Sequence, residues 1–189
     1  MMKNVCYAIL FVGLMIGASC VDAVSPVVKL FKEHLEREIS LEGFKKVYKG
    51  QDSLSYDDFR KRYPFLYVNY IDEECASCVV KIREWYKNSQ SLPVYDKLAY
   101  VFVFRGEDYQ KFLKHRVGKC LVTPFYFLCS KDFTYVINNK NIDRQIIDGG
   151  FLLDEKNRIK VIGSPLKSVP LMDLIGKKIY EEDDKEAIR

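Results

Sequence analysis

The chain has 189 residues, of which 48% are hydrophobic and 30% are charged. These proportions are typical of a folded globular protein and exclude disorder for most of the chain. If residues 1–19 are removed as a leader, 170 of the 189 remain, enough for one domain with a core but not for two large ones. The formal charge of +4, from 30 basic and 26 acidic residues, is too weak and too mixed to favour nucleic-acid binding.

The first residues predict a secretory leader. The uncharged apolar run Val5–Ala18 is shorter than the roughly 20 residues of a membrane-spanning helix, and no later run is long enough. Gly17-Ala18-Ser19-Cys20 resembles a bacterial lipobox, in which Cys20 becomes the lipid-bearing first residue. Without lipid attachment, cleavage would follow Ser19 or Ala23. In either case we expect the mature chain to work outside the cytoplasm, in the periplasm, where disulfides can form.

The segment from residue 20 to 62 predicts an N-terminal helix followed by a linker. Apolar side chains recur at helical spacing from Ser25 to Ile39, and Ser25-Pro26 supplies a cap and a first turn. Ser40–Lys61 is mixed and polar, so we expect a loop there with weak strand content at best. A short amphipathic helix close to the membrane anchor would result.

Alternating strands and helices follow. Apolar and β-branched residues predict strands at Tyr63–Ile71, Leu98–Phe104 and Pro124–Leu128. Between them, helical spacing of Val79, Ile82 and Tyr86 predicts a helix that Cys75 and Cys78 open and that ends near Asn88-Ser89, and a second one at Glu107–Arg116. This alternation implies parallel pairing of the strands with right-handed crossovers.

The last third of the chain predicts a hairpin, a helix and a tail. Gly150–Leu153 and Arg158–Ile162 flank the turn-forming residues 154–157. Val169–Tyr180 places apolar residues on one face of a final helix. Residues 181–189 predict a charged, frayed tail.

A pair of cysteines carries the predicted chemistry. Cys75 and Cys78 follow the first predicted strand and open a helix, where two residues three apart lie on one face and can close a disulfide. Unpaired N–H groups and the helix dipole favour a thiolate at Cys75. We therefore expect Cys75 to attack a partner disulfide and Cys78 to resolve the mixed disulfide.

The order of these elements resembles a thioredoxin-fold domain, and more closely the membrane-tethered, TlpA-like thiol-disulfide oxidoreductases and bacterial thioredoxin-like lipoproteins. The resemblance is carried by LYVNYIDEECASCVVKIREWY, VFVFRGEDYQKFLKH and GGFLLDEKNRIKVIGSP. It implies a thioredoxin-like three-layer α/β sandwich with a central mixed sheet over residues 63–180. It also implies that Cys75 and Cys78 are the paired active-site cysteines.

The sequence departs from that family around the cysteines. Glu74 stands where a tryptophan is common, and its charge, with that of its acidic neighbours, should partly offset the effect of the helix dipole and so raise the pKa of Cys75. Ala76-Ser77 replaces a Gly-Pro type pair. The register of the resemblance places Gly149 just before the FLLD strand, so we expect it to occupy the position of the cis-proline that faces the disulfide. Thr123-Pro124 resembles the usual Thr-Pro dipeptide but comes one strand earlier. Glu74, Ala76, Ser77 and Gly149 would then form the substrate-facing loop.

Alternatives for the cysteines and histidines stay open. Cys75 and Cys78 could form a structural disulfide or remain inert thiols, and the pair alone could bind soft copper, whereas a second CxxC for structural zinc is missing. Cys120 and Cys129 could pair, although sequence gives no distance. Isolated His34 and His115 favour surface or packing roles, as Trp85 and Tyr86 favour packing.

Two functions from different classes are consistent with these residues. The first is an extracytoplasmic oxidoreductase that reduces protein disulfides, is fed by a membrane electron donor and needs no cofactor or metal. The second is a non-catalytic thioredoxin-like lipoprotein that binds a protein partner or a soft metal ion.

Overall fold

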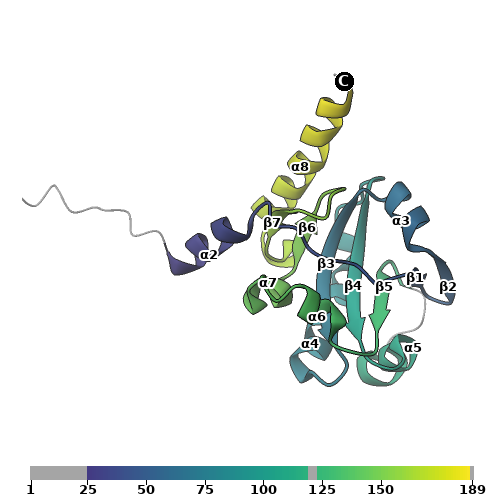
Figure 1. Ribbon diagram of the computed structural model, residues 1–189. Coiled ribbons are helices and arrows are strands. Elements are labelled where there is room, and N and C mark those ends of the chain that lie inside the picture. Colours follow the sequence, from purple (N-terminus) through teal and green to yellow (C-terminus); the bar gives the residue numbers. More distant parts are fainter. Residues whose placement is uncertain (1–24, 119–122, 188–189) are drawn as a thin grey trace, which may run out of the picture. The chain divides into compact units, whose positions relative to one another are not determined.

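A mixed β-sheet organises the part of the chain that begins at His34. Within the described residues of the computed structural model, 25–118 and 123–187, the strands run in the order β2-β1-β5-β4-β3-β6-β7. Figure 1 shows β3, β4 and β5 in the middle of this sheet. The strand bounds are β1 (Lys46–Lys49), β2 (Asp52–Ser55), β3 (Phe65–Asp72), β4 (Leu98–Arg105), β5 (Tyr126–Ser130), β6 (Phe151–Leu153) and β7 (Ile159–Ile162).

The described residues fall into two units, which are divided between Glu33 and His34. Helix α2 (Pro26–His34) accounts for most of the described part of the first unit. The helices of the second are α3 (Tyr56–Arg62), α4 (Ala76–Lys87), α5 (Tyr109–Phe112), α6 (Thr134–Asn138), α7 (Arg144–Gly149), α8 (Val169–Ala187), the 3₁₀ turns Ser89–Ser91 and Pro165–Lys167, and a π-helical turn, Leu113–Val117. The predicted leader and Cys20 lie outside the described residues.

The parallel centre of the sheet confirms the predicted alternation. β3 pairs with β4 over its whole length, from Phe65 opposite Leu98 to Asp72 opposite Arg105, and β4 pairs in parallel with β5. These strands are near-continuous apolar runs because both faces of the sheet are covered. The predicted hairpin is also confirmed, since β6 and β7 are antiparallel and β6 pairs with β3.

Two layers of helices enclose the sheet. On one face, Trp85 of α4 packs against Tyr67 of β3, with ring centroids 5.3 Å apart. On the other face, Tyr135 of α6 stacks on Tyr70, three residues further along the same strand, at 5.9 Å. Because successive strand residues point to opposite faces, α4 and α6 lie on opposite sides of β3. The expected three-layer α/β sandwich is therefore present, and the predicted packing role of Trp85 is confirmed.

The predicted loop at Ser40–Lys61 is wrong. Residues 46–55 form the β1–β2 hairpin, and β1 joins the main sheet through Tyr48 opposite Phe127. Helix α3 follows, with Ser55 as its N-cap accepting a hydrogen bond from the backbone of Asp58. Short, mostly polar strands at a sheet edge carry little hydrophobic signal, whereas the Ser-x-x-Asp capping pattern is readable in the sequence. The sheet thus begins upstream of the predicted boundary at residue 63.

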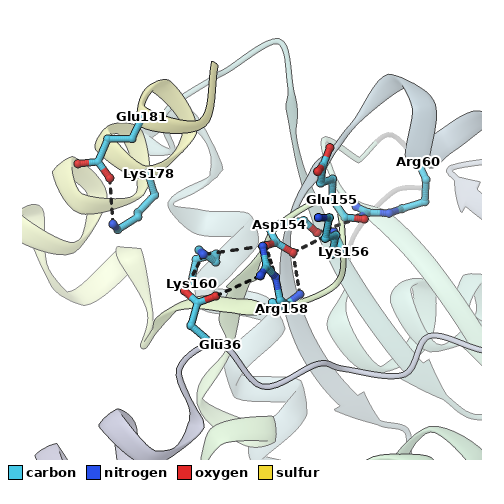
Figure 2. A network of polar contacts seen from close by, with 9 residues as sticks. All are labelled: Glu36, Arg60, Asp154, Glu155, Lys156, Arg158, Lys160, Lys178 and Glu181. Carbon is cyan, nitrogen blue, oxygen red and sulfur yellow. Dashed lines mark hydrogen bonds and ion pairs between the residues drawn. The ribbon is translucent and has the colours of Figure 1, made fainter. Parts of the chain in front are cut away.

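The ends of the first and last helices also differ from prediction. α2 stops at His34 rather than Ile39, because Glu36 takes a left-handed φ of 65° and the chain turns alongside the β6–β7 hairpin. α8 runs on to Ala187 instead of fraying after Tyr180. An ion pair between Lys178 and Glu181, 2.9 Å apart and one turn apart along the helix, spans the predicted end at Tyr180 (Figure 2).

A buried carboxylate holds the turn of the β6–β7 hairpin and is linked, through a lysine, to Glu36. Asp154 is fully buried and accepts hydrogen bonds from the backbones of Lys156 and Arg158 at 2.9 and 2.8 Å. Its second oxygen lies 2.9 Å from the Arg158 guanidinium. Lys160, 4.0 Å from the same oxygen, reaches Glu36 at 2.6 Å (Figure 2). One acid thus organises the turn and two cations around it.

Arg60 of α3 joins this network from the other side of the turn. Its guanidinium donates hydrogen bonds to the carbonyls of Asp154 and Glu155, at 2.9 and 3.0 Å, and to those of Tyr63 and Pro64, both at 3.1 Å. Figure 2 shows Arg60 reaching the turn. The helix that sequence analysis missed is thereby fastened to the hairpin that it predicted.

Replacing Asp154→Ala should lower the free energy of unfolding by about 3 kcal/mol, because removing one partner leaves buried donors and cations uncompensated. Urea unfolding followed by circular dichroism measures the change. Glu155→Ala removes a neighbouring, exposed carboxylate and should change stability by less than about 0.5 kcal/mol. Equal losses in the two variants would contradict the role of Asp154.

Candidate functional site

The paired cysteines lie where β3 gives way to α4. β3 ends at Asp72, whose carbonyl accepts a hydrogen bond from the Cys75 backbone at 3.1 Å. Cys75 is the N-cap of α4, with extended backbone angles, and its Sγ accepts a hydrogen bond from the Cys78 backbone at 3.2 Å. A sulfur thus takes the place that a serine or aspartate oxygen usually holds at a helix start.

The two cysteines differ in exposure in the expected sense. Both are free thiols; Cys75 is half-buried, whereas the side chain of Cys78 is only 6% exposed within the core. Ala76 and Ser77, between them, are exposed, as is Glu74 before them. A partner molecule can therefore reach Cys75 more readily than Cys78.

Hydrogen bonding separates the acidities of the two thiols. Partial burial works against a thiolate at Cys75, but hydrogen bonds from the Cys78 thiol, the Ser77 hydroxyl and the Cys78 backbone outweigh it and lower the pKa of Cys75. Burial, followed by the hydrogen bond to Cys75, raises the pKa of Cys78 to about 11. A negative charge on this pair therefore resides on Cys75, at the positive end of the α4 dipole.

Two of the acidic residues before Cys75 are paired with one arginine. Asp72 makes a two-point ion pair with Arg105, at 2.7 and 2.8 Å, and the same guanidinium lies 2.7 Å from Glu74. Asp72 is the acidic residue that raises the pKa of Cys75, and its effect is outweighed. The expected partial offset by nearby negative charge is therefore present, and it comes from Asp72.

Arg105 was not identified from the sequence. It ends β4 directly opposite Asp72, and its guanidinium lies over the ring of Phe133 at 4.1 Å, a cation–π contact. Phe133 is 50% exposed. The sequence does carry a signal for the Asp72–Arg105 pair. Two apolar strands that are expected to be parallel end in an aspartate and in an arginine.

Lys81 was also missed. It lies one turn after Cys78 on α4, and its ammonium donates to the carbonyls of Tyr70 at 3.2 Å and Asp148 at 2.6 Å. Burial lowers the pKa of Lys81, partly offset by the nearby Cys78. Lys81 therefore ties the start of α4 to β3 and to the segment that precedes Gly149.

Gly149 and Gly150 play different structural parts. Gly149 ends α7, is exposed, and has room for a Cβ with nothing within 4 Å. Gly150 is buried with φ +84°, and a Cβ there would lie 2.7 Å from the Tyr67 hydroxyl and 2.8 Å from the Asn69 side-chain oxygen. The close backbone approach is thus at Gly150, whereas the predicted client-facing role of Gly149 stays a prediction.

The remaining candidates lie away from the pair. His34 is buried and its Nε2 accepts a hydrogen bond from the Asp143 backbone at 3.0 Å, a packing role as predicted, while His115 is exposed. Burial raises the pKa of the Cys129 thiol to about 12. Cys120 lies outside the described residues, so its pairing with Cys129 stays a prediction. The described residues contain no group of three or more side chains arranged to hold a metal ion.

Among the described helices, none combines the length and the apolar character that crossing a bilayer requires. No protein-family model matches this chain, and no curated protein matches it.

Solved structures resemble the chain in fold. The mitochondrial 2-Cys peroxiredoxin of Plasmodium falciparum aligns with a TM-score of 0.50 and 8% identity over 79% of this chain and 96% of that one. A thioredoxin-like protein from Bacteroides caccae has a TM-score of 0.44 and 12% identity. The alignment covers 79% of this chain and 52% of that protein. The thioredoxin domain of a thiol-disulfide oxidoreductase from Bacteroides vulgatus has a TM-score of 0.40 and 12% identity, covering 76% and 94% of the two chains.

Identities this low concern the fold alone. The second unit of the chain has a thioredoxin-like fold, with parallel β3, β4 and β5, the antiparallel β6–β7 hairpin beside β3, and helices on both faces.

Cys75 should react with iodoacetamide well before Cys78 as the pH is raised, because hydrogen bonds lower the pKa of Cys75 whereas burial raises the pKa of Cys78 to about 11. Ser77→Ala removes one donor to that thiolate, so the pH at which Cys75 becomes reactive should rise. Mass spectrometry of modified peptides over a pH series measures both. Ser91→Ala, at an exposed serine on the turn after α4, should leave the profile unchanged; an equal shift there would disprove the role of Ser77.

Gly150→Ala should destabilise the domain by about 2 kcal/mol or more, because it combines a left-handed φ with a clash against Tyr67 and Asn69. Gly149→Ala places a methyl group in open space at the end of a helix and should leave stability unchanged or raise it by up to about 1 kcal/mol. Thermal unfolding of the two variants makes the comparison. A larger loss of stability in Gly149→Ala than in Gly150→Ala would contradict the close backbone approach at Gly150.

Proposed function

We propose that this protein carries out thiol-disulfide exchange through Cys75 and Cys78 and reduces protein disulfides. The observation that carries the proposal is the asymmetry of the pair: a half-buried Cys75 whose pKa is lowered lies beside a buried Cys78 whose pKa is raised to about 11. An accessible thiolate with a protected second thiol is what a two-step exchange requires.

The reaction proceeds through a mixed disulfide. The Cys75 thiolate attacks one sulfur of the client disulfide; a bond forms between Cys75 and that sulfur while the client S–S bond breaks, and the released client thiolate takes up a proton. Cys78 then loses its proton and attacks the Cys75 sulfur, so that the second client sulfur leaves as a thiol. Two electrons pass to the client, and a Cys75–Cys78 disulfide remains.

A dithiol reductant must restore the thiol pair after each cycle. For a protein exported past the membrane, a membrane electron donor supplies these electrons, and a lipid on Cys20 keeps the domain near that donor. The sequence of the leader is what supports the proposed extracytoplasmic location, the lipid attachment and the membrane electron donor.

Clients approach over the exposed surface around Cys75. Glu74, Ala76 and Ser77 lie beside the thiol and are exposed. Gly149 contributes from the end of α7, next to Asp148, whose carbonyl is bound to Lys81 of the same helix as the cysteines. Absence of bulky side chains at Ala76 and Gly149 leaves room for an extended client chain.

Insulin reduction by dithiothreitol tests the activity. The intact protein should accelerate precipitation of the insulin B chain, and Cys75→Ser should reduce the rate to that of dithiothreitol alone, because the attacking sulfur is gone. Cys78→Ser, reduced beforehand and mixed with insulin after dithiothreitol has been removed, should retain the first step and accumulate a mixed disulfide with insulin, visible on a non-reducing gel.

Cys129→Ser is the matched control, since it removes a free thiol that the proposed reaction does not use. It should keep the full rate. If the Cys75→Ser protein matches the intact protein, the catalytic proposal fails, and the domain is better described as a non-catalytic module that binds a protein partner or a soft metal ion.

A further inference from the structure

A cavity of about 520 Å³ opens at the end of the sheet opposite the thiols. It lies where α3 ends and where β4 and β5 begin, and its lining includes Tyr63, Leu98, Tyr100, Phe125 and Tyr126. Cys75 and Cys78 instead follow the carboxyl end of β3. Eight residues of β3, at ~3.3 Å each, separate the two ends by about 25 Å. The cavity therefore shares no residue with the exchange site.

The walls of the cavity are largely aromatic. Tyr63 and Tyr126 meet through their hydroxyl groups, 2.9 Å apart, and their rings pack with centroids separated by 5.4 Å. The Tyr100 hydroxyl is bound to the Pro93 carbonyl at 2.9 Å, which leaves the ring to line the space. At the rim, Val94 is 92% exposed, a large apolar surface with no covering side chain. Size and lining are those of a small-molecule pocket.

Two cations enter the same cavity from different elements. The Lys49 ammonium, at the end of β1, lies 4.7 Å from the centre of the Tyr126 ring. The Arg62 guanidinium, at the end of α3, lies 5.3 Å from the centre of the Tyr63 ring. Within the described part of the chain, neither has an ion pair with an acidic side chain, and Asp96 is the one acid in the lining.

This arrangement has a definite ligand preference. The rings of Tyr63 and Tyr126 are joined by their hydroxyl contact and each has a cation over it, so the four residues form one cluster in the lining of the cavity. A carboxylate placed between Lys49 and Arg62 would form charge-assisted hydrogen bonds with both. A flat apolar body attached to that carboxylate would cover the tyrosine rings and the exposed Val94.

We propose that this cavity binds a small organic anion with a flat apolar body, of the class of aromatic carboxylates. Lys49 and Arg62 bind the carboxylate, and the tyrosine-lined wall binds the ring. The site is distinct from that of the proposed exchange reaction, because the lining of the cavity includes neither Cys75 nor Cys78. A neutral molecule of the same shape lacks the interaction with the cations and binds more weakly.

Isothermal titration calorimetry with 2-naphthoate tests the proposal, with 2-naphthamide as the neutral molecule of the same shape. The intact full chain should bind naphthoate. The amide should bind with an affinity about tenfold lower, as expected for loss of charged hydrogen bonds. Replacing Lys49→Gln together with Arg62→Gln should weaken naphthoate binding by a similar factor and leave amide binding unchanged.

Lys45→Gln together with Lys46→Gln is the matched control: both lysines are exposed, do not line the cavity, and their loss changes net charge equally. Naphthoate should bind this control and the Cys75→Ser variant as it binds the intact protein. If the Lys49 variant does not fold, Arg62→Gln alone, at an exposed side chain, carries the test. Three results would overturn the site: no binding at millimolar naphthoate, equal affinity for the amide, or equal weakening in the control.

Discussion

The parallel pairing of β3 with β4 is the constraint on which both ends of the domain depend. Its register runs without interruption from Phe65 opposite Leu98 to Asp72 opposite Arg105. At the carboxyl end it aligns an acid with a base directly before the turn that leads to Cys75. At the amino end it places the beginning of β4 beside the end of α3, where the aromatic cavity opens. A shift of one residue would turn every side chain of β3 to the opposite face and dissolve both arrangements.

Electrostatics at the thiol pair follows from that register. Three acidic residues precede Cys75, yet the guanidinium of Arg105 binds two of them and is itself held over Phe133. The third, Glu73, accepts a hydrogen bond from the Glu107 backbone at 3.0 Å. These carboxylates are consequently engaged with the neighbouring strand and its following loop rather than directed at the sulfur. Local hydrogen bonds from α4 then determine which thiol carries the charge.

Sequence patterns predicted the long apolar elements and missed those whose burial depends on distant partners. β3, β4 and the β6–β7 hairpin stand out because apolar runs and turn residues are local signals. β1, β2 and α6 are short and partly polar, so no local pattern predicts them. Where their side chains are buried, contacts with distant parts of the chain bury them. The cysteine pair was readable from its spacing, whereas Arg105 and Lys81 acquire meaning from contacts 33 and 67 residues away in the chain.

The segment 36–39 has a consequence for how molecules of this protein meet one another. Its backbone exchanges hydrogen bonds with Asn157 and Ile159, and Ile39 is fully buried. These bonds occupy backbone groups at the start of β7 that would otherwise be open to intermolecular strand addition. At the opposite margin, β2 is four residues long and bears no large apolar side chain except Leu54. Both borders of the sheet are thus poor templates for the edge-to-edge pairing that leads to aggregation.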